Sequence, residues 1–70
     1  MTTIDKVNSV RAMQEPGSYL LNINVTDSYG VSELGVDYVS RPDDLYGYAP
    51  LVREWLENNK GKYKIIPYEG

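Results

Sequence analysis

The sequence contains no cysteine and no histidine, and these two absences exclude several kinds of chemistry. Without cysteine there is no thiol nucleophile and no disulfide bond, and without histidine there is no Ser-His-Asp relay and no histidine ligand for haem. Zinc fingers also draw their ligands from these two residue types. We therefore expect a protein that is not an enzyme and that has no catalytic residue, no cofactor and no metal ion.

Long apolar runs are absent as well. No stretch approaches the roughly 20 apolar residues that cross a bilayer, and residues 1–6 lack the basic and then apolar segments of a signal peptide. The 70 residues suffice for a single small domain, residues 1–70. Since a chain of this length buries only about 60% of its unfolded surface, we expect one thin core. The lack of a long apolar run predicts no membrane partner.

A surplus of positive charge is also missing. Seven Lys and Arg residues oppose ten Asp and Glu residues, which gives a net charge of −3. Proteins that track phosphates carry a basic surface, because released counterions supply much of their affinity. Lys60, Lys62 and Lys64 form a local exception, and lysines beside an edge strand typically keep a protein soluble. We expect no nucleic-acid partner.

Alternating polarity predicts two strands joined by a short loop. In residues 19–26, Leu21, Ile23 and Val25 share one face. In residues 31–40, Leu34, Val36 and Tyr38 share one face, and Glu33, Gly35 and Asp37 share the other. The intervening Asp27-Ser28-Tyr29-Gly30 is typical of a hairpin loop. These patterns predict an antiparallel hairpin with one dry and one wet face.

Residues 7–14 are ambiguous. Ile4, Val7, Val10 and Met13 are spaced by three, as on a helix, whereas Val10 and Ala12 alternate as in a strand. Pro16-Gly17 is a favoured central pair of a type II turn, which would return a first strand along the second. We prefer the strand.

One amphipathic helix is predicted at about residues 50–60. Pro50 suits the first turn, and Gly61 suits the stop. The apolar stripe consists of Leu51, Val52, Trp55 and Leu56. Trp55, the largest apolar side chain, is expected to be buried and to anchor the helix.

Residues 62–68 resemble a last strand, at an edge because Pro67 cannot donate to a ladder. The expected fold is α+β: a small antiparallel sheet of three to four strands with the helix packed on one face.

The tyrosines are the strongest candidates for a contact surface. There are seven of them, with one tryptophan and no phenylalanine, which is too many for one small core. Exposed tyrosine can anchor a protein interface or stack on a sugar. The candidate partner-binding residues are Tyr46, Tyr48, Tyr63 and Tyr68. The alternative interpretation is that the tyrosines only cover the core with their hydroxyls in water. The acidic doublet Asp43 and Asp44 fits neither a glycosidase pair nor a calcium loop, and is best explained as a turn.

Four short segments follow a familiar order along the chain. They are Pro42-Asp43-Asp44, Gly47-Tyr48-Ala49-Pro50, Trp55-Leu56 and Ile65-Ile66-Pro67-Tyr68. This order resembles the N-terminal part of small phage and prophage proteins associated with tail or tail-fibre genes. Those proteins continue with a Pro-rich linker and a helical part, whereas this sequence stops at Gly70. The resemblance implies no active site and places the protein in the cytoplasm of the host cell or on the virion.

The resemblance and the composition together favour a non-enzymatic phage or prophage accessory or structural protein. It would act through protein–protein contacts in tail or tail-fibre assembly, with a homo-oligomer formed through an edge strand as one form of contact. One alternative is a small phage-encoded inhibitor of a host protein. Another is a carbohydrate-binding module that uses tyrosine stacking.

Overall fold

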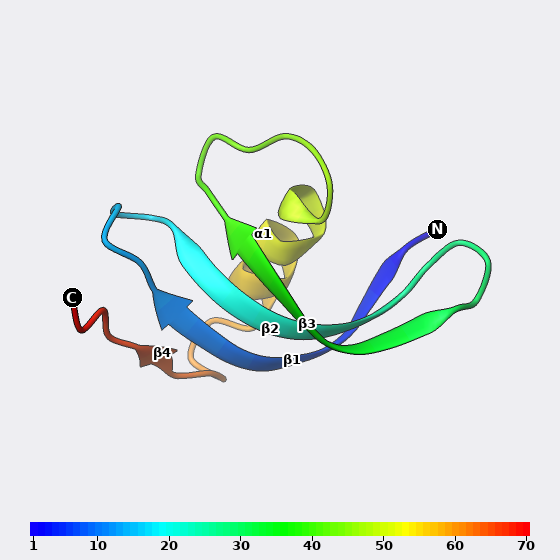
Figure 1. The fold of residues 1–70 in the computed structure, drawn as a ribbon, viewed down its shortest axis with the longest axis horizontal. Coiled ribbons are helices and arrows are strands. Elements are labelled where there is room, and N and C mark those ends of the chain that lie inside the picture. The colour runs from blue at the N-terminus through cyan, green and yellow to red at the C-terminus, as the bar shows by residue number, and fades with distance from the viewer.

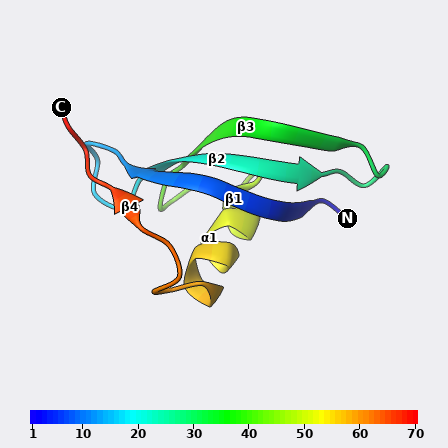
Figure 2. The same ribbon diagram turned by 90° about the horizontal axis from the view of Figure 1, so that it is seen from below.

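The computed structural model describes all 70 residues. The chain forms β1 (Thr3–Ala12), β2 (Tyr19–Thr26), β3 (Ser32–Ser40), α1 (Ala49–Asn58) and β4 (Ile65–Ile66). The sheet has the order β3-β2-β1-β4, and α1 lies on one of its faces (Figures 1 and 2). The other face has no covering layer, and we call it the open face. The predicted α+β fold, a sheet of three to four strands with one helix packed on one face, is confirmed with four strands.

The direction of β4 differs from the prediction. β1, β2 and β3 are antiparallel neighbours, but β4 pairs in parallel with β1, through Val10 with Ile65 and Arg11 with Ile66. The reason is the path of the chain: α1 carries it from β3 at one edge to the opposite edge, so that β4 runs in the same direction as β3 and β1 (Figure 1). Pro67 follows directly and has no N–H to continue the pairing.

The ambiguous segment is a strand, as preferred, and its spacing of three has a structural cause. The pairing of β1 with β2 shifts twice, between Ile4 and Lys6 and between Val7 and Ser9. Each β-bulge inserts one residue, so that side chains three apart return to the same face. The turn between β1 and β2 is also as predicted: Ser18 N donates to Glu15 O at 3.1 Å, and Gly17 between them has φ +85°.

The core lies between the sheet and α1. Five buried apolar side chains form it: Val10, Leu21, Ile23, Val25 and Val52. Fully burying such a side chain contributes about 1.5–3 kcal/mol. Partly buried apolar and tyrosine side chains from all three long strands and from α1 pack around these five residues. At only ten residues α1 is too short to hold itself together in water, and it depends on this packing. No helix of the protein is long and apolar enough to span a membrane.

The helix is anchored by smaller residues than expected. Ala49 and Val52 are its buried residues, and Leu56 packs against the core. Trp55 is only half-buried, with its ring centroid 5.4 Å from that of Tyr63, so the prediction of a buried Trp55 anchor is wrong. Val52 points from the helix toward the sheet. Trp55, three residues later, therefore lies at the side of the helix and is only partly covered.

Candidate contact surfaces

The middle of the open face carries a network of amide side chains. Asn8 donates to the side-chain oxygens of both Asn22 (2.9 Å) and Asn24 (3.0 Å). Asn22 in turn donates to the carboxylate of Asp37 at 2.9 Å, which links all three long strands. Asn8 is the extra residue of the second bulge of β1, and that position allows its side chain to reach two residues of β2. The network therefore ties β1, β2 and β3 together through side chains on the open face.

A second irregularity changes the face of β3. Ile23 pairs with Val36, but Val25 pairs with Glu33, so that Leu34 and Gly35 together lie opposite Asn24. Gly35 has φ +69° and its N–H donates to the side-chain oxygen of Asn24 at 3.0 Å. A left-handed glycine in an unpaired position is the usual form of such a bulge.

The bulge removes Leu34 from the core. Its side chain is 80% exposed, whereas Val36 and Tyr38 pack against the core as predicted. The expectation that Leu34 shares their face is therefore wrong. The physical reason is that one inserted residue reverses the faces of all residues beyond it.

The tip of the β2–β3 hairpin is a turn held by Asp27. Its carboxylate accepts from the N–H groups of Tyr29 (2.8 Å) and Val31 (3.0 Å). Its own N–H donates to Val31 O at 2.9 Å, and its carbonyl accepts from the N–H of Gly30 at 3.1 Å. The turn is therefore fixed, although it lies beyond the end of the helix (Figure 1).

This fixed turn presents apolar side chains to water. Tyr29 is 94% exposed and Val31 is 57% exposed, and Leu34 follows on β3. We call these three residues the hairpin-tip surface. Sequence reasoning missed it, because Tyr29 was one tyrosine among seven and Leu34 was assigned to the core. The Asp-x-Tyr-Gly loop flanked by an apolar residue was the signal that could have located it.

The four tyrosines chosen from the sequence do not form one surface. Tyr46 is 81% exposed and Tyr68 is 48% exposed, but they follow β3 and β4, the two opposite edge strands. Tyr48 and Tyr63 are half-buried and pack against the core.

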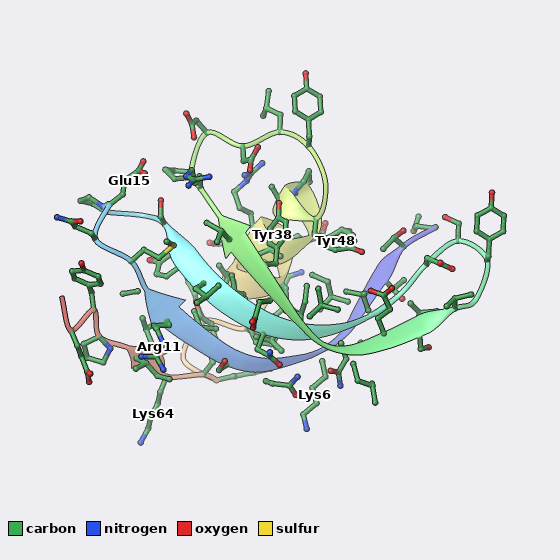
Figure 3. The ribbon with its side chains drawn as sticks, viewed as in Figure 1. Lys6, Arg11, Glu15, Tyr38, Tyr48 and Lys64 are labelled. Carbon is green, nitrogen blue, oxygen red and sulfur yellow. The ribbon has the colours of Figure 1, made fainter.

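Tyr48 has a defined packing partner. The ring centroid of Tyr38 lies 5.5 Å away in an edge-to-face arrangement, on the helix side of the sheet (Figure 3). Burial raises the pKa of the Tyr38 hydroxyl, and the carboxylate of Asp44 raises it further. Asp44 thus raises the pKa of a tyrosine that packs against the core. No group of three or more acidic side chains comes together to hold a metal ion.

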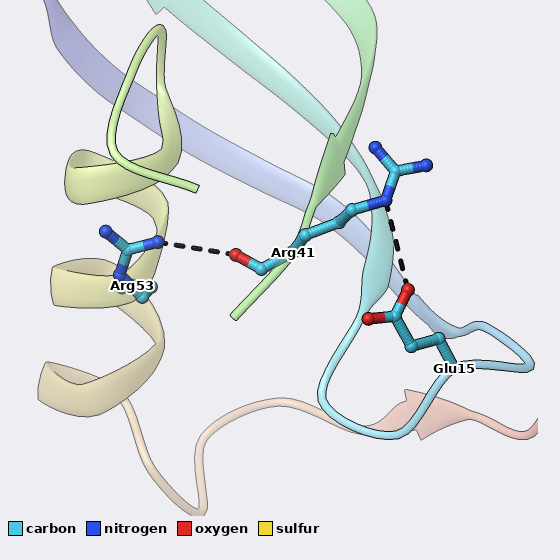
Figure 4. A network of polar contacts seen from close by, with 3 residues as sticks. All are labelled: Glu15, Arg41 and Arg53. Atoms are coloured by element: carbon cyan, nitrogen blue, oxygen red, sulfur yellow. Dashed lines mark hydrogen bonds and ion pairs between the residues drawn. The ribbon is translucent and has the colours of Figure 1, made fainter. Parts of the chain in front are cut away.

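A hollow of about 340 Å³ lies among the β1–β2 turn, the end of β3 and α1. Arg41, Arg53 and Lys60 line it, together with Glu57. The Arg53 guanidinium donates to the carbonyl of Arg41 at 3.4 Å, and Arg41 Nε lies 4.0 Å from Glu15 (Figure 4). Lys60 pairs with Glu57 at 3.2 Å. Carboxylates accompany Arg41 and Lys60 and reduce the positive charge of the hollow, whereas Arg53 contacts the carbonyl of Arg41 and no carboxylate.

Comparison with protein-family models, with curated proteins and with solved structures finds no match to this chain.

Proposed function

We propose that this chain is a non-enzymatic accessory protein of a phage or prophage, and that it works by binding another protein through the hairpin-tip surface. The observation that carries the proposal is the exposure of Tyr29 on a turn that Asp27 holds in place. A tyrosine contributes a large contact area and has few rotatable bonds to immobilise.

The fixed turn favours binding for an energetic reason. A loop that becomes ordered only on binding loses conformational entropy at that step, and this loss weakens the affinity. A turn with four internal hydrogen bonds is already ordered before it binds, so the loss on binding is smaller. The bulge at Gly35 has a comparable effect, since it turns Leu34 toward solvent. Two separate local features, the Asp27 turn and the Gly35 bulge, therefore each leave an apolar side chain exposed.

The biological setting rests on the sequence resemblance. The order of short segments from Pro42 to Tyr68 resembles phage tail and tail-fibre proteins, and it supports a role in tail or tail-fibre assembly. The exposed Tyr46 lies between the first two of those segments, and with Leu45 it forms a second exposed apolar pair. That pair offers a matched control for the hairpin tip.

The test compares two double variants with the wild-type chain. Tyr29→Ser with Val31→Ser alters the hairpin tip, and Leu45→Ser with Tyr46→Ser alters the loop after β3. Each tagged chain is used to capture proteins from cells that carry the phage or prophage, and the affinity for a purified captured protein is then measured. We expect the captured protein to be a tail or fibre protein. The hairpin-tip variant should bind it at least about tenfold more weakly than the wild type, and the loop variant should bind it with unchanged affinity.

Two outcomes would overturn the proposal. Equal affinity of the wild type and the hairpin-tip variant would remove that surface from the contact. Capture of one host enzyme, with inhibition of its activity, would favour the inhibitor alternative. Circular dichroism of all three chains shows whether a loss of binding reflects a loss of folding.

A further inference from the structure

Both outer edges of the sheet are open to further pairing. No strand lies beyond β3, whose nine residues run along one edge. At the other edge β4 pairs only with Val10 and Arg11, so residues 3–9 of β1 have no neighbouring strand on that side. A groove of about 410 Å³ lies beside this free part of β1, between it and the segment that leads into β4. Unpaired edges are templates for another strand.

The two edges carry opposite charge. β3 contains Glu33 and Asp37 and no lysine, arginine or proline. The other edge has Lys6 on β1, and Lys62 and Lys64 line the groove. The chain thus has a charge of −2 along the β3 edge.

The positive edge contains one carboxylate. This is Asp5, which accepts hydrogen bonds from the hydroxyls of Thr3 and Thr26. Three lysines less Asp5 leave a charge of +2 along the β1 edge. Lys6 and Lys64 point away from α1, on the open face (Figure 3).

We propose that copies of this chain associate head to tail, with the β3 edge of one copy docked on the β1 edge of the next. A second copy is favoured as the occupant because the chain itself supplies the complementary charge for each of its edges. A two-fold pairing of β3 with β3 would instead place four carboxylates along one interface. The inference goes beyond the proposed function. Of the hairpin-tip surface only Leu34 lies on β3, and Tyr29 and Val31 precede the strand.

Head-to-tail contact predicts an open series. Every added copy buries one acidic edge and leaves another exposed, so the association does not stop at two unless the copies close into a ring. Salt weakens the contact, because the Debye length falls from about 10 Å at 0.1 M to about 3 Å at 1 M ionic strength. Sedimentation velocity of the wild-type chain, from micromolar to millimolar concentration at these two ionic strengths, measures both properties.

Charge reversal provides the decisive test. Glu33→Lys with Asp37→Lys makes both edges basic, and Lys62→Glu with Lys64→Glu makes both acidic. We expect each variant alone to be monomeric and their equimolar mixture to regain the larger species. Glu54→Lys with Glu57→Lys is the matched control for the β3-edge variant, because it raises the net charge by the same amount on exposed positions of α1. It should associate like the wild type.

Three results would overturn the inference. They are a wild-type chain that stays monomeric at millimolar concentration and low salt, a dimer that persists in both edge variants, and a mixture that stays monomeric although each variant is folded by circular dichroism. The Tyr29→Ser and Val31→Ser variant should associate like the wild type. The assay contains only this chain, so its failure is distinct from a failure of the hairpin-tip proposal.

Discussion

On the helix-covered face of the sheet, Leu21, Ile23 and Val25 are buried under α1, whereas Asn22 and Asn24, which alternate with them, hydrogen-bond across the open face. The covered face gains its stability from removing apolar surface from water. The open face gains little, since water competes for every amide bond it makes. The two faces of β2 therefore differ in what they contribute: one face buries the apolar core, and the other carries side-chain hydrogen bonds that link the three long strands.

The largest test of this division uses two leucines of the same sheet. Leu21 is fully buried and Leu34 is 80% exposed, although the sequence pattern assigns both to the core face. We expect Leu21→Ala to lower the free energy of unfolding by about 2–5 kcal/mol, enough to unfold much of so small a domain. Leu34→Ala should change it by less than about 0.5 kcal/mol. Urea denaturation followed by circular dichroism measures both, and equal losses would contradict the bulge at Gly35.

A smaller effect is expected on the open face. Asn24→Ala removes the oxygen that accepts from the Gly35 N–H and from Asn8, and should cost about 1 kcal/mol, since water replaces part of what is lost. Asn24→Asp keeps an acceptor in place and is the matched control. Hydrogen exchange gives a local readout: the Gly35 amide should exchange faster in Asn24→Ala and not in Asn24→Asp. Equal protection in both would show that the network does not fix the bulge.

Much of the fold follows from local signals. Alternation predicts β2, Pro16-Gly17 predicts the first turn, and the segment between Pro50 and Gly61 predicts a helix whose ends lie within about two residues of α1. Each of these signals depends on neighbours in the sequence. The turn in particular needs only the fixed φ of Pro16 and the freedom of Gly17 at φ +85°.

The parts that failed depend on distant residues. A strand pattern assumes a strict period of two. Nothing local indicates that Asn8 inserts into a ladder, and a glycine such as Gly35 permits a bulge without fixing it, because a bulge forms only against its partner strand. The prediction that Leu34 faces the core is wrong for this reason. The same error hides the exposed hairpin-tip residues from a reading of the sequence pattern. The parallel direction of β4 likewise depends on where α1 crosses the sheet. The same tertiary geometry places Val52, and not Trp55, at the centre of the contact between helix and sheet.

The smallest effect tests how well the covered face excludes water at its margin, where Tyr38 packs against Tyr48. Burial, and then Asp44, raise the pKa of Tyr38 above 10.0. The unfolded chain therefore ionises this tyrosine first, so its contribution to stability is complete below pH 10 and is lost as the pH rises through the folded pKa. Tyr38→Phe should lack this loss, and a difference titration of tyrosinate absorbance against it isolates the Tyr38 pKa. Asp44→Asn should lower that pKa, and Asp43→Asn serves as the neighbouring control. A Tyr38 pKa at or below its ordinary value would mean that water reaches the hydroxyl freely. The region that α1 shields from water would then end closer to the core than Tyr38.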